Sequence, residues 1–154
     1  MPRPDRPYEP KLYTYTLPGD WIVVAGRTDQ DNDYLSLKMA APNDYWFHVR
    51  GMPGSHVVLR VPAGREPNGA VIKAAAAIAA WHSKKREARQ VGVSCTRARY
   101  VTKPRGAKPG TVQIRKEKTI TVRPSVPQEG PQEGPEQEPG SASGSETGGW
   151  STDE

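Results

Sequence analysis

The apolar residues of this chain occur in short alternating runs separated by Pro, Gly, Asn and Asp, a pattern typical of β-strands joined by turns. The runs LYTYT at residues 12–16 and WIVVAG at 21–26 flank a Pro-Gly-Asp turn. YWFHV at 45–49 and HVVLRV at 56–61 flank the turn GMPGS, which predicts a β-hairpin with a loop longer than two residues. Further short strands are expected at VGVSCT, RYV, TVQIR and TITVR.

Two segments have the composition of helices. Residues 70–88 (AVIKAAAAIAAWHSKKREA) are rich in alanine, which has the highest helix propensity. A shorter helix of about two turns is expected at YLSLKMA, with Asp31-Asn32-Asp33 supplying its N-cap. Together these elements predict an α+β fold, with one bent, mainly antiparallel sheet around one long Ala-rich helix.

Pro, Gly and charged residues divide the chain into three parts. Residues 1–10 alternate Pro with charged residues and are expected to form a flexible arm. Residues 11–124 contain the strand and helix patterns and form the expected folded domain. Residues 125–154 are rich in Pro, Glu, Gly and Ser, contain PQEG in tandem and have too few apolar residues for a core. A disordered acidic tail is expected there.

The net charge of +5 is distributed unevenly. All 22 Lys and Arg lie at or before Arg123, together with only 10 of the 17 acidic residues. The expected domain therefore has an excess of twelve positive charges, whereas residues 124–154 contain acids and no bases. Such a domain needs an anionic partner, such as nucleic acid, an acidic membrane surface or an acidic protein.

Cysteine usage and hydropathy indicate the compartment. The single cysteine, Cys95, cannot form an intrachain disulfide, and its strand-like neighbours suit a small buried residue. No apolar run approaches the roughly 18 residues of a membrane span. The N-terminus has no apolar segment of the kind found in secretory signals. We therefore expect a soluble cytoplasmic protein.

The basic residues are concentrated in one block. Residues 84–123 contain 13 Lys or Arg and only two acids. In VTKPRGAKPG the bases alternate with Gly and Pro, so that backbone amides can meet phosphates while Lys103, Arg105 and Lys108 neutralise them. An ordinary solvated face is the alternative, but solubility alone would mix charges of both signs. The block favours binding to a phosphate backbone.

The predicted hairpin also contains groups that could support catalysis. Ser55, His48, His56 and Asp44 include the residue types of a catalytic triad, yet Ser55 lies in a turn without the sequence pattern that flanks a nucleophile. The two histidines and His82 also lack the spacing of metal ligands. No catalytic residue, metal or cofactor is therefore expected.

RNA contact is a further interpretation of the same hairpin. Strand alternation places Trp46 and His48 on one face and Phe47 on the other. Trp46, His48 and Arg50 could stack on an unpaired base or bind a phosphate, and core packing of Trp46 is equally compatible with the sequence. Arg27, just before the short helix, is another candidate. The polar residues after it are expected to cap that helix and tie its loop to the hairpin.

These motifs together resemble a known family. GR…ND.L..K.A..ND.WFH.R..PGSHVV, then AA..AA.HSK and V.KP.GAKPG.V….KT, are similar to the NFACT-R domain, the RNA-binding module at the C-terminal end of NEMF, RqcH and FbpA-type proteins. The resemblance extends from about Gly26 to Val122. The matching positions are Gly26, Arg27, Asn32, Asp33, Asp44, Trp46, His48, Gly54, Ser55, His56, Lys103, Gly106, Lys108 and Gly110.

The resemblance implies an α+β fold and an RNA-facing role near the ribosome and tRNA, in ribosome-associated quality control. Asp31 stands where the family usually has glutamine. The other domains of the large relatives are not recognisable, so we expect a stand-alone copy of the module and do not carry over the relatives' synthesis of C-terminal tails.

Our hypothesis from the sequence is a non-catalytic RNA-binding module for tRNA or rRNA, with the ribosome as a further partner. No membrane or small-molecule substrate is expected. The predicted RNA-binding residues are Arg27, Trp46, His48, Arg50, Ser55, His56, Lys103, Arg105 and Lys108. Two alternatives remain: a nucleic-acid-processing enzyme that uses His48, His56 and Asp44, and a general binder of DNA or other polyanions.

Overall fold

The computed structural model describes residues 8–134. Its strands are β1 (Leu12–Leu17), β2 (Trp21–Gly26), β3 (Tyr45–Val49), β4 (Val57–Leu59), β5 (Val91–Arg97), β6 (Val101–Thr102), β7 (Gln113–Ile114), β8 (Lys118–Val122) and β9 (Gln132–Gly134). Its helices are α1 (Asp29–Tyr34), the π-helix η1 (Leu35–Met39), α2 (Gly69–Trp81) and the 3-10 turn η2 (Ala98–Tyr100).

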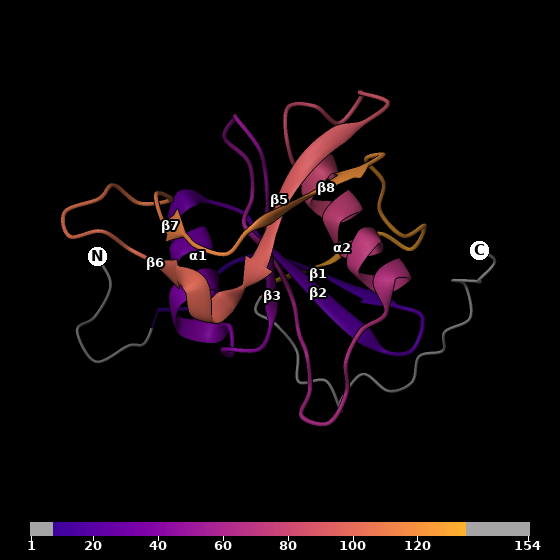
Figure 1. Cartoon of the computed structure of the whole chain (residues 1–154), viewed down its shortest axis with the longest axis horizontal. Helices are drawn as coiled ribbons and strands as arrows, with labels where there is room; N and C mark the ends of the chain where they lie inside the picture. The colour runs from indigo at the N-terminus through magenta and orange to yellow at the C-terminus, as the bar shows by residue number, and fades with distance from the viewer. Residues whose placement is uncertain (1–7, 135–154) are drawn as a thin grey trace.

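Within this range one sheet has the strand order β8-β5-β3-β4-β2-β1-β9, and β6 pairs with β7 in a separate ribbon. Every pair of neighbouring strands in both is antiparallel. The predicted α+β class and antiparallel sheet are therefore confirmed (Figure 1). The hairpin of β3 and β4 is confirmed too, with Trp46 opposite Val58.

The sheet is covered on both faces, because alternate residues of a strand point to opposite sides. Phe47 packs in a cluster with the alanines of α2, whereas Trp46 packs in a second cluster with Leu35 of η1 and Val101 of β6. The predicted separation of Trp46 and Phe47 is confirmed. Figure 1 shows α2 on one side of the sheet, away from α1, β6 and β7. The small alanines let α2 lie close to the strands.

The Ala-rich helix is shorter than the sequence predicts. α2 has 13 residues and ends at Trp81, so the prediction of one long helix through residue 88 is wrong. Groups outside the helix donate hydrogen bonds to the carbonyls at its end. The Ser83 hydroxyl donates to Ala80, Arg86 Nε donates to Trp81, and the Ser55 amide donates to His82. Two local bonds and one tertiary bond from the hairpin turn thus satisfy the end of a helix that propensity alone would continue.

The short helix begins earlier than predicted. Its N-cap is Thr28, whose Oγ accepts a hydrogen bond from the amide of Asp31 at 3.0 Å, so the prediction of a cap at Asp31-Asn32-Asp33 is wrong. Those three residues belong to α1 itself, and the chain continues directly into η1. The predicted capping and tying role of this polar segment is nevertheless confirmed, because Asn32 Oδ1 accepts from the His56 amide at 3.0 Å.

A last strand completes one edge of the sheet. β9 pairs antiparallel with β1, placing Gln132 opposite Thr14. The described chain therefore contains strand pairing within the stretch from residue 125 that the sequence predicts to be a disordered tail. Residues 135–154 of that tail and residues 1–7 of the predicted arm lie outside the described residues.

Two further expectations concern Cys95 and membranes. Cys95 is buried, as predicted, and burial raises the pKa of its thiol to about 11. None of the helices within residues 8–134 combines the length and apolar character needed to cross a bilayer.

Asp44 is a buried anchor of the fold, only 1% exposed. Its Oδ1 accepts from the Val61 amide at 2.8 Å, and its Oδ2 accepts from the Ala41 amide at 2.9 Å. Arg60 Nε lies 3.0 Å from the same Oδ2. The carboxylate therefore joins the start of β3 to the chain that leaves β4.

Replacing Asp44 with Ala should destabilise the protein by about 3–5 kcal/mol, because it leaves two backbone amides without their acceptor and removes the carboxylate that pairs with Arg60. Urea unfolding followed by tryptophan fluorescence measures this loss. Glu66→Ala is the control, because Glu66 pairs with Arg97 at the surface and its loss should cost no more than about 1 kcal/mol. Equal effects of the two substitutions would contradict the anchoring role.

Candidate nucleic-acid interface

Two of the predicted RNA-binding residues form a buried polar network. His56 is 2% exposed, and its Nδ1 lies 2.8 Å from the Oγ of Ser36. The indole of Trp46, also 2% exposed, donates to that Oγ at 2.9 Å. In this conformation neither ring has a face open to an RNA base, and both side chains hold the hairpin against η1.

His48 extends this network toward the surface. Its ring stacks with Trp46 at 6.0 Å between centroids and meets the edge of His56 at 5.5 Å. Burial lowers the pKa of His48, and hydrogen bonds to the backbone of Gly54 and Val49 oppose that shift. His48 is only partly buried, so of these three rings it is the one placed to reach a ligand.

The basic loop at residues 103–110 has one braced cation and two exposed ones. Lys103 Nζ donates to the carbonyls of Lys108 and Thr111 at 2.6 and 3.0 Å and lies 3.1 Å from Asp33 Oδ2. An ammonium group has three donors, and these three acceptors can use all of them. Arg105 and Lys108 are exposed. The geometry gives Lys103 a bracing position and leaves the other two facing solvent.

Two tight turns shape this loop. The amide of Ala107 donates to the Pro104 carbonyl at 3.1 Å, and that of Thr111 donates to the Lys108 carbonyl at 3.0 Å. Gly106 and Gly110 occupy the third positions of these turns with φ of +79° and +87°, values that favour glycine. The GAKPG motif therefore has a structural basis.

The loop and the hairpin meet at α1. The Gly110 amide donates to Asp33 Oδ1 at 3.0 Å, and a Cβ on Gly110 would lie 2.9 Å from the carboxylate carbon of Asp29. The Gly110 backbone also hydrogen-bonds to His56. Two motifs about fifty residues apart are therefore parts of one surface.

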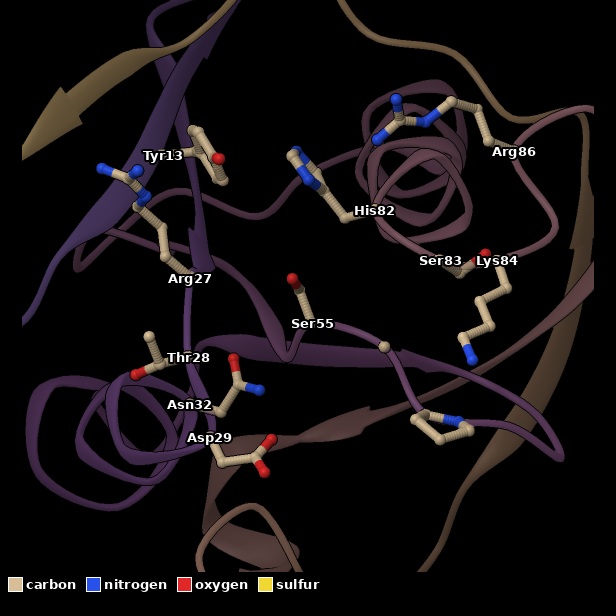
Figure 2. A pocket seen from close by; sticks show the side chains of 12 residues that line it. Tyr13, Arg27, Thr28, Asp29, Asn32, Ser55, His82, Ser83, Lys84 and Arg86 are labelled. Carbon is tan, nitrogen blue, oxygen red and sulfur yellow. The ribbon is translucent and has the colours of Figure 1, made fainter.

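A pocket of about 400 Å³ adjoins this junction (Figure 2). Two predicted residues line it. The Arg27 guanidinium lies over the Tyr13 ring at 5.0 Å, and Ser55 Oγ donates to the Gly26 carbonyl at 2.8 Å. Ser55 therefore has a structural bond of its own. The other lining residues are Tyr13, Thr28, Asp29, Asn32, Pro53, Gly54, His82, Ser83, Lys84 and Arg86.

Sequence reasoning did not assign the cations after α2 to a site. In the sequence, Lys84 and Arg86 belong to the basic block of residues 84–123, and His82 lacks the spacing of a metal ligand. His82 Nε2 lies 2.5 Å from the Tyr15 hydroxyl, which holds its ring against Tyr13. The sequence signal for this side of the pocket is the PGSHVV motif, because its Gly54 forms a β-bridge with Ser83 just after α2.

Arg50 is on a different part of the surface. Its NH1 group donates to Thr119 Oγ1 at 2.5 Å and lies 3.8 Å from a carboxylate oxygen of Glu117, beside β8. It does not line the pocket. Among the described residues no cluster of three His, Cys, Asp or Glu could hold a metal ion.

Comparison with known proteins identifies the family. The model of the NFACT protein RNA binding domain matches residues 11–116. The chain belongs to this family. An Rqc2 homolog, RqcH, of Bacillus subtilis is 40% identical over 119 residues, which cover 77% of this chain and 20% of the relative. RqcH of Streptococcus suis is 38% identical over 117 residues, which cover 76% of this chain and 21% of that relative.

A solved structure shares the fold of this NFACT-R chain. The C-terminal part of the fibronectin/fibrinogen-binding protein from Streptococcus suis superposes with a TM-score of 0.69 and 35% identity, over 81% of this chain and 49% of that one. This chain spans about a fifth of the length of the two RqcH relatives.

The histidines make folding stability depend on pH. Burial, with a smaller contribution from His48, lowers the pKa of His56 to about 4. Burial and the charge of Arg86 lower that of His82 to about 4. An unfolded histidine titrates near 6.5, so the unfolded chain binds more protons between these values. Stability is thus fully present above about pH 6.5 and is lost as the pH falls toward 4.

Lowering the pH from 7 to 5 should therefore remove about 1–2 kcal/mol of stability through His56 alone. Urea unfolding at constant ionic strength measures the change. His82→Gln should reduce the dependence on pH, because one of the two shifted groups is then absent. Equal stability at both pH values would show that the histidines are not held neutral.

Proposed function

We propose that this NFACT-R protein is a non-catalytic RNA-binding module that holds structured RNA, tRNA or rRNA, near the ribosome in the cytoplasm. One observation supports this most strongly: a loop braced by Lys103 presents the exposed cations Arg105 and Lys108, and it joins α1, at whose N-terminal end further cations line the pocket. Family membership supports RNA as the anion, because the matched domain is an RNA-binding domain. The relation to RqcH supports the ribosomal setting.

The proposal that the protein is non-catalytic rests on how the candidate acid and base groups are engaged. Asp44 accepts from two backbone amides and pairs with Arg60. His56 is buried in the network with Ser36. A general base must reach its substrate within hydrogen-bonding distance, and neither group is exposed to do so.

Binding should depend steeply on salt, because cations that meet phosphates release counterions, and each such contact adds about 0.7–0.9 to the slope of log affinity against log salt. Fluorescence anisotropy with labelled tRNA at several salt concentrations measures this. Competition with duplex DNA of equal phosphate number tests the alternative of a general polyanion binder. The RNA should be recovered intact, because no turnover is expected.

Absence of salt-dependent binding to tRNA, rRNA or ribosomes at low ionic strength would refute the proposal. Equal competition by DNA would favour the polyanion binder. Cleavage or modification of the RNA that His48→Ala abolishes would favour the enzyme.

The loop cations should separate into two classes. Arg105→Gln combined with Lys108→Gln should weaken tRNA binding and lower the salt slope by about 1.5, with the melting temperature unchanged. Lys103→Gln should lower stability by about 1–2 kcal/mol, because it leaves the Asp33 carboxylate and two carbonyls without their donor. Anisotropy and thermal melting measure the two effects.

Lys73→Gln is the control, since Lys73 is an exposed cation on α2 outside the loop and the pocket. It should change neither quantity appreciably. If Lys103→Gln left the melting temperature unchanged, Lys103 would not brace the loop. If the double variant bound tRNA like the wild type, the loop would not be part of the interface.

A further inference from the structure

The pocket of Figure 2 is a built feature of the fold. Its wall at the hairpin turn is bonded to the end of α2, because the Ser55 amide donates to the His82 carbonyl at 3.2 Å and Gly54 forms a β-bridge with Ser83. A Cβ on Gly54 would lie 3.2 Å from a methyl of Val49 and 3.3 Å from that carbonyl, so a larger residue would separate the two segments.

The pocket presents cations from two separate segments. Arg27 follows β2, and Lys84 and Arg86 follow α2. Ring contacts restrain both guanidinium groups: Arg27 lies over Tyr13 at 5.0 Å, and Arg86 lies over Trp81 at 4.6 Å. Planar groups held in this way lose little freedom on binding a phosphate, which they match geometrically. Figure 2 shows Arg86 extending toward His82.

The aromatic residues of the pocket are not available to stack on a base. The His82 ring stacks on Tyr13 at 4.8 Å, while Arg27 lies over the same ring at 5.0 Å. Two groups this close to one ring must occupy opposite faces, so both faces of Tyr13 are covered. His82 is neutral at pH 7, because burial and Arg86 lower its pKa to about 4. The pocket therefore offers cations and polar groups, and Tyr13 has no open face for a base.

A carboxylate gives the pocket a second kind of contact. Among the described residues that line it, Asp29 is the only acidic one, and its carboxylate lies close to Gly110. A carboxylate accepts hydrogen bonds from hydroxyls and repels phosphates. Each nucleotide of RNA has a phosphate and a 2′-hydroxyl, and DNA lacks the 2′-hydroxyl. The volume of about 400 Å³ is near the lower end for ligand pockets and suits a short stretch of backbone.

We propose that the pocket binds a short stretch of RNA backbone, with successive phosphates on Arg27, Lys84 and Arg86 and a 2′-hydroxyl on the carboxylate of Asp29. This inference rests on the proposed RNA-binding function and deepens it. The pocket distinguishes RNA from DNA and does not read the base.

The experiment compares labelled single-stranded RNA and DNA 12-mers of the same sequence by fluorescence anisotropy. Wild-type protein should prefer RNA, and Asp29→Asn should reduce that preference by about 5- to 10-fold without weakening DNA binding. Lys84→Gln and Arg86→Gln should weaken both strands. RNA 12-mers of uridine, adenosine or cytidine should bind within about threefold of one another, because no base is read.

Lys85→Gln is the matched control, because Lys85 is exposed beside Lys84 and does not line the pocket. It should leave the affinity for both strands unchanged. Lys84→Gln is more informative than Arg86→Gln, because Arg86 also bonds the end of α2. Thermal melting of each variant identifies any loss of folding.

Two results would overturn the inference in distinguishable ways. If wild-type protein binds RNA and the Asp29 and Lys84 variants behave like it, the pocket is not the subsite and the proposed function stands. If wild-type protein binds no RNA at low salt, the proposed function fails and the subsite fails with it.

Discussion

The six-residue helix α1 joins the separate parts of this molecule through its side chains. In α1, successive side chains are bonded to different segments. Asp31 accepts from the Tyr8 hydroxyl at 2.5 Å and from the Lys11 amide at 3.0 Å, Asn32 accepts from the hairpin at His56, and Asp33 accepts from the basic loop at Gly110. A helix of six residues is not stable by itself, so its position depends on these bonds and on the Thr28 cap.

This arrangement imposes a close approach between β2 and α1. A Cβ on Gly26 would lie 2.1 Å from Asn32 Oδ1, so the helix can reach the hairpin only if this position has no side chain. The same approach places Arg27 beside the pocket and Asp29 beside Gly110. The positions of Arg27 and of the basic loop thus depend on the absence of a side chain at Gly26 and on the hydrogen bonds of the polar side chains of α1. Because the loop is already braced, little conformational entropy remains to be lost on binding.

Local patterns in the sequence predict much of this fold. Alternation gives the strands and separates Trp46 from Phe47, and the turn residues mark the hairpin. The end of α2 was not predicted from propensity, because the bonds that satisfy it come from Ser83, Arg86 and Ser55, the last about thirty positions away. The cap at Thr28 was missed because Asp31, Asn32 and Asp33 lie just beyond it, each a good cap by type.

The candidate site was predictable only in part. Charge pattern found the basic loop, but it treated Lys103 like Arg105 and Lys108, and only the structure shows that Asp33 and two carbonyls surround its ammonium group. The pocket was missed because its walls come from segments far apart in the chain. Residue type also suggested that Trp46 and His56 contact RNA, whereas both side chains are buried and pack inside the domain.

The strand at the C-terminal end of the described chain affects where the domain can be divided. The family match ends at residue 116, yet β8 and β9 lie beyond it and form the two outermost strands of the sheet. A fragment ending at that boundary would leave the backbone donors and acceptors of β5 and β1 unpaired on one side. The family match therefore ends inside the sheet, and the unit that folds as one sheet extends to residue 134 in this protein.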